Sequence, residues 1–154
     1  MNYWLMKTEP TTFGLEHLAR AAKQTSAWDG VRNFQARNMI RDDMRPGDRA
    51  FLYHSSCAVP GIVAIMEIAS AARPDGSAFE RKNPHFDPDS DPKTPRWFMV
   101  DVKLKRKLKR VITLEDLRAH ATKELAGMWL LRRGKRLSIT PIDAAHWKFI
   151  LSLE

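Results

Sequence analysis

The apolar run from about Gly61 to Ala69 constrains the fold more than any other segment of the chain. The run contains Ile62, Val63, Ile65, Met66 and Ile68. A strand with one face in water alternates apolar and polar side chains, whereas a nearly continuous apolar run indicates a strand that is covered on both faces. We therefore expect a strand here that other parts of the chain cover on both sides.

Three further segments have the composition of strands. Residues 3 to 8 are apolar and β-compatible and are stopped by Pro10. Residues 49 to 54 follow a strong turn signal at residues 45 to 48. From about Trp97 to Leu104, apolar side chains alternate with the others, which is the pattern of a half-buried strand.

Helices are expected in four places. Apolar residues recur at helical spacing from about Leu15, and a second helix is expected over residues 34 to 43. Thr113 begins a segment that resembles a capping box, and an apolar stripe continues from there to Leu125. Residues 140 to 143 repeat the start signal, with proline at the first position of a last helix. Separate strands and helices of this kind predict an α+β architecture.

Residues 73 to 96 hold five of the nine prolines together with four aspartates. This composition predicts a long excursion from the sheet, and loops of that length are often functional. Neither an internal repeat nor a linker interrupts the rest of the chain. We therefore expect a single domain over residues 1 to 152.

The net charge favours a polyanionic partner. Lysine and arginine number 26 against 18 acidic residues, which gives a formal charge of +8. Such a charge concentrates nucleic acid around the surface, although it also serves plain solubility. Basic residues gather at Lys103 to Arg110 and at Arg132 to Arg136. The candidates for contacts with nucleic-acid phosphates are Lys105, Arg106, Lys107, Arg132, Arg133, Lys135 and Arg136. Alternatively, these side chains cover a solvated strand end.

Several site classes lack a signature in this sequence. Cys57 is the only cysteine, so an intrachain disulfide and a cysteine-based zinc cluster are excluded. The five histidines do not pair at helical spacing, and no phosphate-binding glycine motif is found, so we expect neither a metal nor a cofactor. The N-terminus has no secretion signal and no apolar run reaches about 20 residues, which predicts a cytoplasmic protein.

The segment from Trp28 to Asn38 combines an aromatic ring, two guanidinium groups and several amides. A base that leaves its stack needs a ring to stack on and polar groups for its edge. The alternative is structural: Trp28 lies in the core, Arg32 pairs with Asp29, and Asn33 caps the next helix.

Taken together, these segments resemble the EVE domain family. The resemblance rests on residues 3–10, 28–33, 35–38, 47–48, 53–55, 60–63, 87–88, 95–97 and 136–138, which stand in family order and cover nearly the whole chain. It implies an α+β, PUA-like fold, a small mixed β-barrel flanked by helices. Gly14 and Ala64 depart from the pattern, at a helix cap and in strand packing.

The resemblance also implies a function and a site. It implies a non-enzymatic nucleic-acid-binding module that reads a modified or flipped base in DNA or RNA through an aromatic pocket. The expected ligand-binding residues are Lys7, Trp28, Arg32, Asn33, Arg37, Asn38, Tyr53, His54, Ser55 and Trp97. We expect the protein to be a monomer.

Two other functions are considered beside this one. Related ASCH domains include amidohydrolases that act on a modified nucleoside, and Lys7-Thr8-Glu9 contains residue types suited to that chemistry. Adjacent strand residues point to opposite faces, however, so Glu67 or another acid would have to complete the set. The third candidate is an adaptor whose basic surface binds an acidic protein.

Overall fold

The central strand of the sheet is the one that the apolar run predicts. The computed structural model describes residues 1–134 and 136–154. Strand β4 (Gly61–Ile68) lies between β3 (Arg49–His54) and β6 (Phe98–Thr113) and is antiparallel to both. Its side chains enter two separate core clusters, Ala64 and Met66 in one and Ile62 and Ile65 in the other. The expectation that this strand is covered on both faces is confirmed.

The remaining strands extend the sheet on both sides of β4. The order is β2-β6-β4-β3-β1-β7, with β5 (Arg73–Pro74) paired to β6. Strand β1 (Tyr3–Thr8) runs parallel to β3, and the edges are β2 (Thr25–Trp28) and β7 (Ile139–Ile142). The strands at residues 3–8 and 49–54 have the bounds expected from the sequence.

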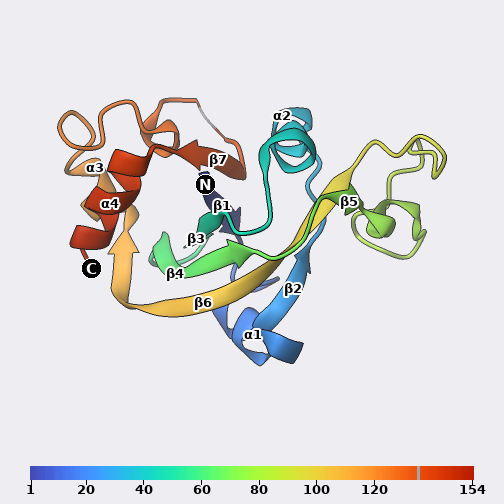
Figure 1. Ribbon diagram of the computed structural model, residues 1–154, viewed down its shortest axis with the longest axis horizontal. Helices are drawn as coiled ribbons and strands as arrows, with labels where there is room; N and C mark the ends of the chain where they lie inside the picture. Colours follow the sequence, from blue (N-terminus) through green and yellow to red (C-terminus); the bar gives the residue numbers. More distant parts are fainter. Residues whose placement is uncertain (135) are drawn as a thin grey trace.

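The small mixed β-barrel that the resemblance implies is not closed in the described part of the chain. The long strand β6 curves beneath the other strands and bends upward toward α3 (Leu114–Arg118) (Figure 1). Two register shifts in the β4–β6 ladder increase this bend. In the described part of the chain, however, the edge strands β2 and β7 do not pair with each other, so the sheet stays open.

Strand β6 is much longer than the sequence suggested. It spans 16 residues, whereas the alternating pattern predicted a strand that ends near Leu104. The basic run therefore lies within a strand and not beyond its end. The backbone of β4 pairs with it as far as Gly61 opposite Thr113, while Lys103, Lys105 and Lys107 stay exposed. Lysine side chains on the solvent-exposed face of a strand do not interrupt its backbone hydrogen bonds to the neighbouring strand.

The last helix is present, but its expected start at Thr140-Pro141 is wrong. These residues belong to β7, and helix α4 (Ala144–Ser152) begins after Asp143. Among the described strands, β7 pairs only with β1, and proline is tolerated in an edge strand because one side needs no ladder hydrogen bonds. The capping box at Thr113 is confirmed, but α3 ends at Arg118, well before Leu125.

The helices contribute buried side chains to both core clusters of the sheet. Helix α1 (Leu15–Arg20) begins where it was expected, and α2 (Phe34–Asn38) continues into the π-helical turn η2 (Met39–Asp43). A 3-10 helix, η1 (Ala22–Gln24), leads into β2, and another, η4 (Trp129–Leu131), precedes β7. None of the helices in the described chain is both long enough and apolar enough to span a membrane.

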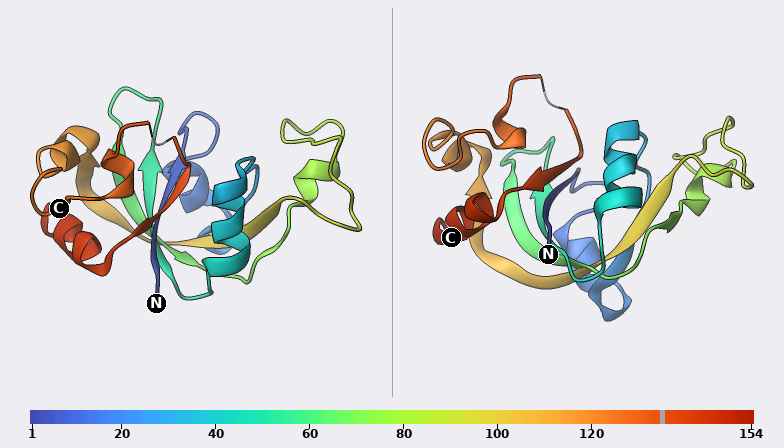
Figure 2. Two further views of the ribbon diagram at one scale, coloured as in Figure 1. Left: turned by 90° about the horizontal axis from the view of Figure 1, so that it is seen from above. Right: turned by 45° about the horizontal axis from the view of Figure 1, so that its top comes forward.

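The proline-rich segment leaves the sheet as expected. It carries β5 and the 3-10 helix η3 (Gly76–Phe79) and projects from one end of the molecule (Figure 2). Asp75 and His85 of this segment contact the loop that connects β2 with α2, and these contacts shape the candidate site.

Candidate functional site

A cavity of about 610 Å³ opens beside the ends of β1 and β2. Its lining comes from residues 7–8, 12–13 and 26–33, from His85, and from Arg136 and Ser138. These segments lie far apart in the sequence. The backbone N–H of Lys7 donates to the carbonyl of Ser138 at 2.8 Å, which fixes two of the walls to each other.

Trp28 provides the aromatic wall of this cavity. It ends β2, is 7% exposed, and contacts the Phe13 ring edge-on at a centroid distance of 5.9 Å. Buried indole N–H groups usually have a hydrogen-bond partner. Trp4 and Trp97 follow this rule, since they donate to Asp48 and Asp87. Within the described residues, the indole N–H of Trp28 has no such partner, so it remains available to a ligand.

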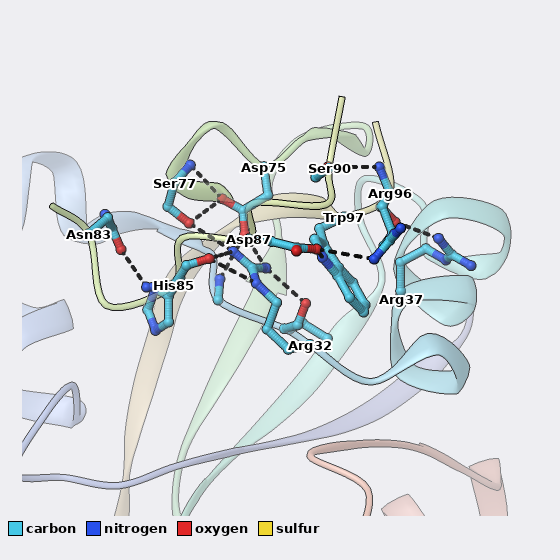
Figure 3. A network of polar contacts seen from close by, with 12 residues as sticks. Arg32, Arg37, Asp75, Ser77, Asn83, His85, Asp87, Ser90, Arg96 and Trp97 are labelled. Carbon is cyan, nitrogen blue, oxygen red and sulfur yellow. Dashed lines mark hydrogen bonds and ion pairs between the residues drawn. The ribbon is translucent and has the colours of Figure 1, made fainter. Parts of the chain in front are cut away.

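Asp75 fixes the loop between Trp28 and α2. Its fully buried carboxylate accepts hydrogen bonds from Gly30 N–H at 2.8 Å and from Arg32 Nη1 at 3.0 Å (Figure 3). Ser77 donates to the other oxygen through its backbone N–H and its hydroxyl. Burial alone would raise the pKa of Asp75, but these hydrogen bonds outweigh it and hold the pKa below its ordinary value. The carboxylate therefore stays charged and the loop stays anchored.

Gly30 allows the loop to approach the excursion closely. Its φ of +79° lies in the left-handed region, and a Cβ at this position would lie 2.5 Å from the His85 ring. The carbonyl of His85 accepts two hydrogen bonds from Arg32, from Nε at 3.1 Å and from Nη2 at 2.6 Å. The excursion thus forms one wall of the cavity. The structural alternative in the sequence analysis paired Arg32 with Asp29, whereas the structure pairs it with Asp75.

Lys7 lies between this cavity and a second one. It lines both, and its ammonium group lies 5.9 Å from the centroid of the Tyr53 ring. Burial lowers the pKa of Lys7 below its ordinary value. Thr8 also lines the first cavity, and its hydroxyl donates to the Phe13 carbonyl at 2.7 Å.

The other residues expected around Trp28 have structural partners. Asn33 lines the cavity and also caps α2 by accepting from the Ala36 N–H at 3.0 Å. Arg37 donates to the carbonyl of Arg96 and, through Nε, to Asn38 at 2.8 Å. Trp97 is 6% exposed and stacks on Phe34 at 4.9 Å. Arg37, Asn38 and Trp97 are not part of the cavity lining.

The end of β3 lies outside the first cavity. Tyr53 and Ser55 line the second cavity, which the sequence did not separate from the first. His54 accepts a hydrogen bond from the Leu15 N–H at 3.2 Å through Nε2 and so supports the start of α1. Burial lowers the pKa of His54.

The basic candidates divide among three places. Arg136 lines the first cavity, whereas Arg132 and Arg133 line the second. Lys105 and Arg106 border another cavity beside Tyr3 and Trp147, and Lys107 is exposed on the same strand. Lys135 lies outside the described residues.

Phe13, Ser26, His85 and Ser138 are among the lining residues that sequence reasoning did not assign to the site. Ser26 carried a signal, because it stands two residues before Trp28 and alternation along a strand places both on one face. Nothing in the local pattern connects the other three with Trp28.

The carboxylate that an enzymatic reading required is not beside Lys7. Glu67 pairs instead with Arg49 at 3.3 Å and with Lys105 at 3.9 Å. Among the residues that line the described cavity, Asp29 is the only acid, and it is exposed. In residues 1–134 and 136–154, no three histidine, cysteine or acidic side chains form a group that could hold a metal ion.

Comparison with known proteins identifies the family. A sequence model of the EVE domain matches residues 2–153. The chain belongs to the EVE domain family. This EVE domain is 47% identical over 168 residues to thymocyte nuclear protein 1 of Mus musculus, and the match covers 99% of this chain and 74% of that protein. The resemblance found in the sequence is thereby confirmed.

Solved structures share the architecture. The structure of human THYN1 protein in complex with 5-methylcytosine containing DNA is 43% identical, with a TM-score of 0.95, and the alignment covers 99% of the EVE domain and 97% of that chain. A YTH domain, that of the Zygosaccharomyces rouxii MRB1 protein, is 17% identical with a TM-score of 0.50 over 99% of this chain and 83% of that one, and shows the fold alone. The expected α+β, PUA-like fold is confirmed, with an open sheet.

Proposed function

We propose that this EVE domain binds a modified base of DNA, with 5-methylcytosine as the first candidate, and does not transform it. The cavity beside Trp28 carries the proposal. It offers an aromatic wall, a free indole donor and a volume of about 610 Å³ at the surface. The complex of human THYN1 protein with 5-methylcytosine containing DNA supports the choice of ligand.

Each part of the cavity has a task in this proposal. The rings of Trp28 and Phe13 provide apolar surface for a planar base, and stacking of one base contributes about 1–3 kcal/mol. Asn33 and the backbone around Gly30 also line the cavity. They offer polar groups to the donors and acceptors along the edge of a bound base. The guanidinium of Arg136 supplies positive charge at the rim.

The methyl group itself contributes little. Burial of one methyl group stabilises a complex by about 0.8 kcal/mol, which corresponds to roughly a fourfold preference. We therefore expect modest discrimination between methylated and unmethylated cytosine.

Filling the cavity tests the proposal better than truncating Trp28, because that side chain also belongs to the core. Ser26→Phe places a ring in the cavity from a half-buried position. We expect the affinity for a 5-methylcytosine duplex to fall at least tenfold, measured by fluorescence anisotropy. Ser152→Phe, an exposed position at the end of α4, is the matched control. Equal affinities of the two folded variants would rule the cavity out as the base site.

A further inference from the structure

A second cavity of about 690 Å³ lies on the other side of Lys7. Its lining combines the end of β3, the start of α3 and the segment from Leu130 to Gly134. Figure 1 shows that this last segment, in orange, arches above α3 and α4 before it leads into β7. The cavity is thus adjacent to the proposed base site and separate from it.

The charged groups of this cavity are all cationic. They are Lys7, Arg118, Arg132 and Arg133, and no aspartate or glutamate belongs to the described lining. Arg132 lies over the Trp129 ring at 5.3 Å. Arg118 and Arg133 have neither an ion pair nor a hydrogen bond to any described residue.

On strand β6, by contrast, both arginines pair with acids. Arg106 contacts Glu154 at 2.7 Å, and Arg110 contacts Asp116 at 2.7 Å. The guanidinium groups of Arg118 and Arg133 therefore lack the acidic partners that the arginines of β6 have in the described chain. Unpaired guanidinium groups at a concave surface suit an anion that accepts two parallel hydrogen bonds, as a phosphate does.

Neutral donors complete the lining. A phenol keeps its proton at neutral pH, and burial raises the pKa of Tyr53 further, so its hydroxyl can donate to an anion. The Ser55 hydroxyl lines the same cavity. Leu114 and Leu130 add apolar surface of the kind that a sugar ring contacts.

We propose that the second cavity binds the phosphate groups that flank the base held in the first cavity, with Lys7 between the two. The inference rests on the proposed function, since the base in the first cavity and the phosphates in the second belong to one DNA strand. It assigns Arg118, Arg132 and Arg133 to the backbone of the strand that carries the base, and leaves the cations of β6 outside this contact.

The decisive experiment removes two charges from the cavity. Arg118→Gln with Arg133→Gln breaks no ion pair of the described chain, so the fold should persist. We expect at least a tenfold loss of affinity for the 5-methylcytosine duplex. The slope of log affinity against log salt should become shallower by about 2, because each phosphate contact contributes roughly 0.9.

The control is Lys103→Gln with Lys109→Gln, which removes the same charge from exposed positions of β6. It should change the affinity for the duplex less than threefold. Equal losses in the two double variants would overturn the inference, because the charge alone would then explain the effect.

A thermodynamic cycle identifies the source of the phosphate. Duplexes with neutral methylphosphonate linkages on both sides of the 5-methylcytosine should bind the natural protein at least tenfold more weakly, with no further loss in the Arg118 and Arg133 variant. Additive losses would overturn the inference. Binding of inorganic phosphate alone at these arginines, detected by NMR, together with additive losses, would assign the cavity to a free phosphate.

The two proposals fail differently. If Ser26→Phe abolishes binding while the double arginine variant matches its control, the base site stands and the phosphate site falls. If Ser26→Phe has no effect, the base site falls, and any remaining effect of the arginines reports DNA binding without a base in the first cavity.

Discussion

The His54 imidazole couples the stability of the fold to pH. Its Nε2 accepts from the Leu15 N–H, and burial holds its pKa below the ordinary value near 6.5. The unfolded chain therefore binds the proton more tightly than the folded one. This contribution to stability is complete above about pH 6.5 and is lost as the pH falls from there through the lowered pKa of the folded state.

We expect the free energy of unfolding in urea to decrease between pH 7.5 and pH 5.5. His54→Gln keeps an acceptor for Leu15 but does not titrate, so its decrease should be smaller by about 1 kcal/mol, the usual net value of one hydrogen bond. The same pH dependence in both proteins would mean that other groups cause it.

At the scale of elements, Asp75 joins the 73–96 excursion to the loop after β2. Its carboxylate is fully buried and pairs with Arg32, whose side chain is 24% exposed. Removal of one partner from a buried pair costs about 3–5 kcal/mol, because the other charge stays behind. We expect Asp75→Ala to lower the unfolding free energy by roughly 3 kcal/mol and to weaken DNA binding by loosening the Trp28 loop.

A matched control exists on the neighbouring strand. Asp101 pairs with Arg73 at 2.7 Å, but both side chains are about a third exposed or more. Exposed pairs contribute at most about 1 kcal/mol, so Asp101→Ala should be mild. Similar losses in urea unfolding for the two variants would show that the Asp75 pair does not anchor the loop.

At the scale of the whole molecule, the net charge of +8 and the cavity act on different parts of DNA. Charge attracts phosphates, which are the same in methylated and unmethylated duplexes, whereas the methyl group is felt only inside the cavity. We therefore expect plots of log affinity against log salt to be parallel for the two duplexes, about fourfold apart. A gap that closes as salt rises would place the methyl discrimination outside the cavity.

Much of the fold follows from local patterns in the sequence. Strands β1, β3 and β4 and the helical segment 34–43 were predicted because periodicity and turn residues act over a few neighbouring positions. The family followed from motifs along the whole chain and is confirmed. The same local reasoning failed at Thr140-Pro141, where pairing with β1 outweighs a helix-start signal.

The sites depended on contacts that no local pattern contains. The sequence identified Trp28 and several cationic site residues, because residue type alone shows which side chains can stack on a base and which can bind a phosphate. Only the tertiary structure decided that His85 and Ser138 join Trp28, that Tyr53 and Ser55 face a different cavity, and that β6 carries its cations elsewhere. Those outcomes depend on strand register and on the packing of loops. Both are determined by contacts between residues that lie far apart in the sequence.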